Sequence, residues 1–67
     1  MAISPKAARV IVGLTQQEAA DALGISKGAL LSYEKYRTFP DIGMAKKIAA
    51  LYGMSVDDII FVPEDCA

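Results

Sequence analysis

The sequence predicts an all-α fold, a compact domain of five helices, and three observations lead to that prediction. Capping signals recur, with a hydroxyl residue followed three positions later by an acidic one in Thr15 with Glu18 and Ser55 with Asp58. The apolar residues between the caps follow helical spacing rather than the strict alternation of a strand, and only the run 59–62 also suits an extended segment. A glycine or proline stands close to the point where each helical pattern ends.

The first two helices are marked by their starting residues. Ser4 precedes Pro5, and a capping serine before a proline is typical of a helix start, because the missing N–H of proline would have no partner there. This segment runs to Gly13. The first capping signal begins a second helix at Thr15, which ends at Gly24.

The other three helices follow in the same way. Ser26 caps a third helix, and Pro40 stops it, since proline cannot continue a helix. Asp41 opens a fourth helix that reaches Gly53 and whose apolar residues keep helical spacing, namely Ile42, Ala45, Ile48, Ala49 and Tyr52. The second capping signal begins a last short helix, which Pro63 bounds.

Length and charge limit what the chain can be. Its 67 residues suffice for one small domain, so we expect a single domain over residues 1–67 with a C-terminal tail at 61–67. The net charge is −1, which does not by itself favour a nucleic-acid partner. The acidic residues gather late, however. Residues 1–40 hold five basic and three acidic side chains, and residues 41–67 hold two and five, so the first part can present a basic face.

The residues that enzymes and metal sites need are missing. There is no histidine, the single cysteine is Cys66, and Asp58 is a cap partner rather than half of an acid–base pair. We expect no catalytic residue, no metal, no cofactor and no small-molecule ligand. No run approaches the ~18 to 20 apolar residues of a membrane helix, so we expect a cytoplasmic protein without membrane contact.

The joint between the second and third helices is unusually tight. Only Gly24, Ile25 and Ser26 connect them, and both apolar stripes must face one core, which requires a steep crossing. Ala20 suits the closest approach, and Gly24 can adopt the left-handed backbone that turns the chain. Residues 15–34 therefore predict a helix-turn-helix unit, whose second helix can enter the major groove of DNA.

The stretch GLTQQEAADALGISKGALLSYE resembles the helix-turn-helix of phage lambda repressor and Cro type regulators, and the similarity extends over roughly residues 6–60. The resemblance implies a sequence-specific transcriptional regulator, such as a small phage or mobile-element repressor, with double-stranded DNA as partner. It implies that Lys27, Gly28 and Ser32 read base edges. It also implies that Arg9 and Glu34 form a structural ion pair between the first and third helices.

The residues themselves assign further contacts. On the outward arc of the third helix, Leu31 is an apolar exception that either meets a thymine methyl, contacts a protein or folds back onto the domain. DNA phosphates are bound by helix N-termini, by cations and by hydrogen-bonding side chains. The residues of these kinds that we expect to contact phosphate are Gln16, Gln17, Lys35, Tyr36, Arg37 and Thr38. For the last four, the alternative is a loop that is merely solvated. Family members usually have glycine at Tyr36, so this residue either adopts a left-handed backbone or shifts the helix end.

The apolar surplus predicts a homodimer. The chain is 54% hydrophobic, and its late apolar residues place the dimer contact at Tyr52, Ile60, Phe61 and Val62. Two copies would read a near-palindromic site with their third helices ~34 Å apart. The alternative function is a protein-binding modulator, an antirepressor or antitoxin with the same fold, which the net acidity, the bare Gly28 and Leu31 favour.

Overall fold

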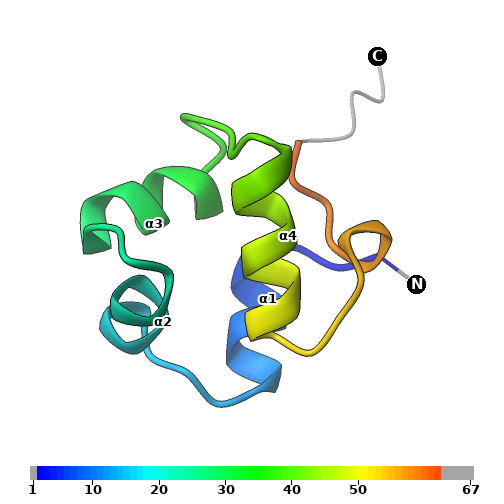
Figure 1. Ribbon diagram of the computed structural model, residues 1–67, viewed down its shortest axis with the longest axis horizontal. Helices are drawn as coiled ribbons and strands as arrows, with labels where there is room; N and C mark the ends of the chain where they lie inside the picture. The colour runs from blue at the N-terminus through cyan, green and yellow to red at the C-terminus, as the bar shows by residue number, and fades with distance from the viewer. Residues whose placement is uncertain (1, 63–67) are drawn as a thin grey trace.

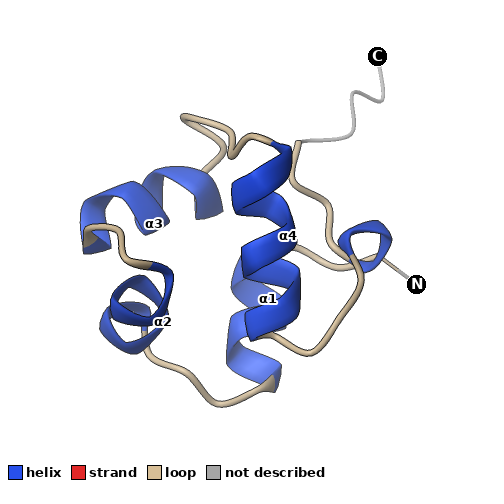
Figure 2. Cartoon of the chain, viewed as in Figure 1, coloured by secondary structure: helices blue, strands red, loops and turns tan. Residues whose placement is uncertain are grey.

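The computed structural model describes residues 2–62, and these residues form helices connected by short loops (Figures 1 and 2). The α-helices are α1 (Pro5–Ile11), α2 (Gln16–Leu23), α3 (Lys27–Glu34) and α4 (Ile42–Leu51), followed by the 3-10 helix η1 (Val56–Asp58). No helix in this part of the chain has the length and apolar character needed to cross a membrane. The predicted tail beyond Val62, including Cys66, lies outside the described residues.

The all-α prediction is confirmed, but the number of α-helices among residues 2–62 is four, not five. The fifth predicted helix is the single 3-10 turn η1, since the backbone is already extended at Ile59. The predicted cap pair is present: Asp58 accepts hydrogen bonds from the backbone N–H and the hydroxyl of Ser55. These two hydrogen bonds lower the pKa of the Asp58 carboxyl. Ile59 forms a parallel bridge with Ile3, so residues 58–60 tie the two ends of the domain together.

Each α-helix starts at a capping side chain that the sequence identifies. Ser4 and Ser26 accept hydrogen bonds at 3.1 Å from backbone N–H groups three residues later, and Asp41 does so at 2.8 Å. Thr15 and Glu18 form the reciprocal capping box, with distances of 3.1 and 2.9 Å. These contacts satisfy backbone donors that an uncapped first turn would leave without a partner.

The four α-helices also end alike. In each, the residue after the last turn has a left-handed backbone, and the amides at this position and the next donate to carbonyls three and five positions earlier. This is the Schellman arrangement, which normally uses glycine because a side chain disfavours positive φ. The four residues that adopt it are Gly13, Gly24, Tyr36 and Gly53.

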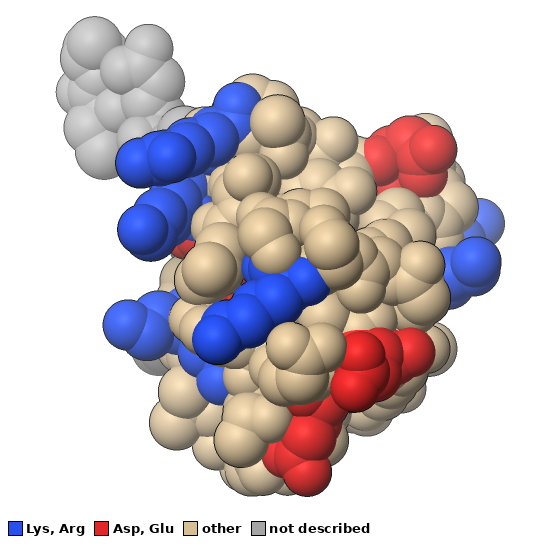
Figure 3. Space-filling model, turned by 90° about the vertical axis from the view of Figure 1, so that its left-hand side faces the viewer, with Lys and Arg blue, Asp and Glu red and all other residues tan. Residues whose placement is uncertain are grey.

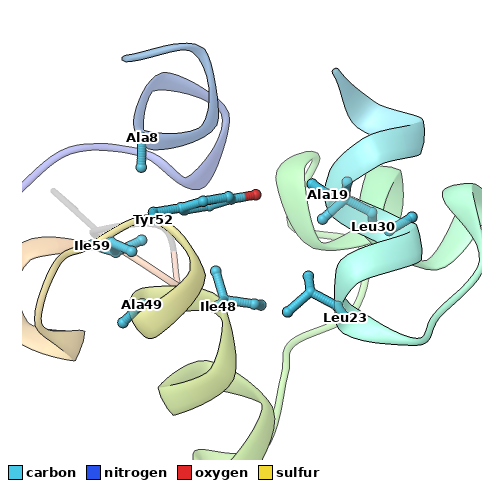
Figure 4. Packing of buried hydrophobic residues seen from close by; sticks show 9 residues of the cluster. Ala8, Ala19, Leu23, Leu30, Ile48, Ala49, Tyr52 and Ile59 are labelled. Carbon is cyan, nitrogen blue, oxygen red and sulfur yellow. The ribbon is translucent and has the colours of Figure 1, made fainter. Parts of the chain in front are cut away.

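The core lies between α1 and α4 on one side and the α2–α3 pair on the other. Figure 4 shows the ring of Tyr52 between Ala8 and Ile48, with its hydroxyl pointing towards Ala19. Tyr52 is only 2% exposed, which contradicts its predicted place in a dimer contact: a side chain in the core has no surface to offer a second copy. The prediction rested on Tyr52 being one of the late apolar residues, and an apolar residue can belong to the core as readily as to a subunit contact.

The Tyr52 hydroxyl has no hydrogen-bond partner within the described chain. A buried hydroxyl in this position costs about 1 to 3 kcal/mol relative to a paired one. Replacing Tyr52 by phenylalanine should therefore leave the free energy of unfolding at neutral pH unchanged or raise it by about 1 kcal/mol. Urea denaturation followed by circular dichroism measures this difference.

The same substitution should change how stability depends on alkaline pH. Burial raises the pKa of Tyr52 above 10.0, with a further rise from the charge of Glu34 and an opposing effect of Arg9. The folded state thus favours the neutral phenol, and the stability that this preference supplies is present below about pH 10 and lost as the pH rises through the folded-state pKa. Wild type should lose stability above pH 10 more steeply than Tyr52→Phe, and equal losses would contradict this assignment.

Candidate nucleic-acid interface

The joint between α2 and α3 has the geometry that the sequence predicts. Ala20 has no exposed surface where the two helices pack together, and Gly24 turns the chain with a φ of 73°. Ile25 is half-buried against the core and fills the corner. Figure 1 shows the result: α2 and α3 run in clearly different directions on the left-hand side of the molecule, away from both described ends of the chain.

The N-terminal part of α3 is open to solvent. Leu30 anchors the helix, being 1% exposed, while Lys27 and Gly28 in the first turn are exposed. Ser32 and Leu31 are half-buried, so only part of the predicted outward arc is fully uncovered. A Cβ placed on Gly28 would meet no atom closer than the Ser26 hydroxyl oxygen at 4.0 Å, so packing within the chain does not require glycine there.

The first turn of α2 keeps backbone donors free within the described part of the chain. Its capping box occupies the amides of Thr15 and Glu18, and the amides of Gln16 and Gln17 make no hydrogen bond within the described residues. The side chain of Gln17 donates to the Asp21 carboxylate at 2.8 Å, so its amide group is already oriented along α2. Two free N–H groups at a helix N-terminus favour an anion.

The loop after α3 carries cations and one residue that corrects the sequence prediction. Lys35, Arg37 and Thr38 are exposed. Tyr36 has the left-handed backbone that the sequence offered as one of two outcomes, with a φ of 59°. Its hydroxyl donates to the Ile60 carbonyl at 2.9 Å, and its backbone amide donates to the Tyr33 carbonyl. Both donors are therefore occupied within the chain, which contradicts a phosphate-binding role for Tyr36.

A buried ion pair holds the end of α3 against α1. Arg9 Nε donates to Glu34 Oε2 at 2.7 Å, and the two side chains are 9% and 3% exposed. Arg9 Nη1 also donates to the Leu14 carbonyl at 2.8 Å, which fixes the guanidinium from a second direction. The residues that the resemblance pairs are thus joined, and the orientation of α3 depends on this bond.

Charge is unevenly distributed over the face formed by α2 and α3. Figure 3 views this side of the molecule and shows Lys and Arg side chains gathered on its left and across its centre. Asp and Glu side chains lie towards the lower edge and the upper right. A molecule with a net charge of −1 therefore still presents a basic region beside the helix pair.

The predicted dimer segment differs in exposure along its length. Ile59 is 5% exposed and belongs to the core. Ile60 and Phe61 are half-buried, and Val62 is 56% exposed. The Ile60 amide donates to the Ile3 carbonyl at 2.8 Å, so this residue is also held by the N-terminal segment.

Comparison with known proteins agrees with this geometry. The sequence pattern of the family described as "Helix-turn-helix" matches residues 6–59, which span α2, α3, α4 and η1 and all of α1 except Pro5. The chain belongs to the lambda repressor and Cro type of helix-turn-helix regulators. The family assignment covers the capped pair α2 and α3 together with the helices that support it.

Three similar proteins fall in the same functional class. An uncharacterized HTH-type transcriptional regulator of Methanocaldococcus jannaschii is 33% identical over 57 residues, covering 85% of this chain and 86% of that protein. Another from Methanothermobacter thermautotrophicus is 35% identical, with 84% and 83% covered. The cryptic phage CTXphi transcriptional repressor RstR of Vibrio cholerae is 33% identical over 52 residues, 78% of this chain and 47% of RstR.

Sequence reasoning missed two features of this helix-turn-helix domain. The bond between Tyr36 and Ile60 joins residues 24 positions apart, and no local pattern signals it. The exposed apolar run at the end of α1 was also missed, with Val10, Ile11 and Val12 at 59%, 66% and 41% exposure. Three consecutive apolar residues cannot all face one core from a helix, which is a signal that the sequence does contain.

Proposed function

We propose that this chain is a sequence-specific transcriptional regulator that binds double-stranded DNA with α3 in the major groove. The observation that carries the proposal is the uncovered start of α3, where Lys27 and Gly28 are exposed. The first turn of α2 adds two amides that make no hydrogen bond within the described residues. Lys27 can donate to guanine O6 and N7, Ser32 can pair with several bases, and Gly28 lets the helix approach closely. The family and the similar regulators support the same assignment.

Phosphate contacts would surround this reading helix. The amides and side chains of Gln16 and Gln17 offer donors on one side, and Lys35, Arg37 and Thr38 are exposed on the other. A helix held between two sets of phosphate contacts is fixed in register and depth, while the bases themselves are read only from its exposed arc. Tyr36 takes no part in donating to phosphate.

The functional unit we propose is a homodimer acting as a small phage or mobile-element repressor on a near-palindromic operator. Phe61 and Val62, with the exposed part of Ile60, supply the apolar contact, and Tyr52 is left out because it is buried. A two-fold axis would set the two copies of α3 about one helical turn, ~34 Å, apart. A single copy with so few base-reading side chains would bind weakly.

Two substitutions should separate base reading from phosphate binding. Lys27→Ala should lower discrimination between the best and a scrambled site, by about 1 to 3 kcal/mol. Arg37→Ala should weaken binding to all duplexes by a similar factor and reduce the salt dependence, because it removes a phosphate contact. Fluorescence anisotropy with both duplexes measures the two effects, and equal losses from both variants on both duplexes would contradict the division of roles.

The second candidate function is binding of a partner protein, as in an antirepressor or antitoxin. It is favoured by exposed apolar side chains, among them Ile11 at 66%, Ile42 at 75% and Phe39 at 51%. Phe39 also lines an open hollow of about 470 Å³ between α3 and the start of α4, together with Tyr33, Asp41, Gly43, Met44 and Lys47. A protein partner on such a surface would be held by apolar contact rather than by phosphate neutralisation.

Salt dependence distinguishes the two functions. Binding through ~4 to 6 phosphates per dimer should make log affinity fall by about 4 to 5 for each unit of log salt concentration. An apolar protein contact should respond little to the same change. A duplex affinity that stays constant between 50 and 200 mM salt would contradict the proposed DNA interface.

A further inference from the structure

The end of α3 is built differently from the ends of the other helices. All four α-helices close with the same pair of backbone hydrogen bonds, and three of them place glycine at the left-handed position. Tyr36 occupies that position after α3, and among residues 2–62 it is the single residue other than glycine with positive φ. Glycine would adopt this turn at lower energy, because a Cβ disfavours the left-handed backbone conformation.

The side chain of Tyr36 makes a contact that glycine could not make. Its hydroxyl donates to the Ile60 carbonyl at 2.9 Å in a partly buried setting. The Ile60 amide in turn donates to the Ile3 carbonyl, and the Ile3 amide donates to the backbone carbonyl of Asp58. The residue between Lys35 and Arg37 is thus fastened to a segment that is itself paired with the N-terminal end of the domain.

We propose that Tyr36 is a positioning residue, a clamp that holds loop 35–38 against segment 58–62 so that Lys35 and Arg37 face the phosphates beside α3. Tyr36 acts through these two cations and does not touch DNA. With the left-handed backbone at Tyr36, the side chain reaches segment 58–62, where its hydroxyl donates to the Ile60 carbonyl. This role rests on the proposed DNA-binding function.

The clamp also connects two parts of the interface. Segment 58–62 contains Phe61 and Val62, the residues we assign to the subunit contact. The carbonyl that receives the Tyr36 hydroxyl belongs to Ile60, immediately before them. A second copy packed on Phe61 and Val62 would therefore stabilise the same segment that positions the phosphate-binding loop, and subunit pairing and loop placement would favour each other.

Tyr36→Phe tests the clamp because it removes the hydroxyl and leaves the ring in place. We expect duplex affinity at 0.1 M salt to fall about 5- to 20-fold, by the same factor for specific and scrambled sites. The slope of log affinity against log salt concentration should decrease by about one per protomer. Amide hydrogen exchange of free protein should become about tenfold faster at Arg37 and Ile60. A purely structural role would change stability without changing the salt slope.

The matched control is Tyr33→Phe, three residues earlier at the end of α3, since Tyr33 is half-buried and its hydroxyl makes no hydrogen bond within the described residues. This variant should keep the wild-type slope and exchange rates. If the wild-type protein binds the duplex and Tyr36→Phe shows the same salt slope as wild type, the clamp is overturned and the proposed function is not. A wild-type chain that binds no duplex would overturn the proposed function, and the role of Tyr36 in binding with it.

Discussion

Replacing Arg9 by methionine should lower the free energy of unfolding by about 3 to 5 kcal/mol, because it leaves the Glu34 carboxylate buried without its partner. The Glu34 side chain is 3% exposed and its bonded oxygen lies 2.7 Å from Arg9 Nε. A domain of 67 residues has only about 3 to 10 kcal/mol of stability in total, so this loss brings it close to unfolding at 25 °C. Urea denaturation measures the difference directly.

The control for this experiment removes both charges. The double variant Arg9→Met with Glu34→Leu should recover most of the lost stability, since neither buried charge then lacks a partner. It should still bind DNA less well than wild type, because the bond that orients α3 is absent. A single variant that loses less than about 1 kcal/mol would show that Glu34 is solvated well enough to do without Arg9.

Leu30→Ala should lower the free energy of unfolding by about 2 to 5 kcal/mol, because it opens a cavity between α3 and the rest of the core. Leu30 is 1% exposed and lies on the side of α3 opposite Gly28. Loss of this buried side chain should also weaken duplex binding, since α3 would no longer be held in a fixed orientation on the core. Thermal denaturation and anisotropy on the same sample measure both effects.

The neighbouring leucine is the natural comparison. Leu31 is half-buried, and Leu31→Ala should change stability by less than about 1 kcal/mol. If Leu31 meets a thymine methyl, its loss should reduce affinity only for sites that carry thymine at one position. Equal destabilisation by the two alanine variants would mean that α3 does not present the face assigned to it.

The fold could be predicted from the sequence because its helix starts are local. Ser4, Thr15, Ser26 and Asp41 each cap the helix that follows, and the side chains that bond the backbone lie within three residues of their partners. The joint between α2 and α3 is equally local, since Ala20 and Gly24 determine it. The last helix was overestimated because its capping signal is the same whether one turn or several follow.

The site could be predicted only where exposure follows from helical spacing. Lys27 and Gly28 are exposed as the spacing predicts, whereas Ser32 is half-buried because neighbouring parts of the fold cover it. Tyr36 and Tyr52 were assigned to contacts with partners, and each is instead used within the chain. An aromatic side chain suits a core, an internal hydrogen bond and an interface equally well, so only the tertiary structure distinguishes them.

Selection of bound fragments from a random duplex pool tests most directly whether α3 reads DNA. We predict enrichment of an inverted repeat whose half-sites lie about 10 base pairs apart, centre to centre, with guanine at one position in each half. The guanine preference should disappear when the selection is repeated with Lys27→Ala. A pool that shows no enriched repeat with the wild-type chain would contradict a DNA-reading role and favour the partner-protein function.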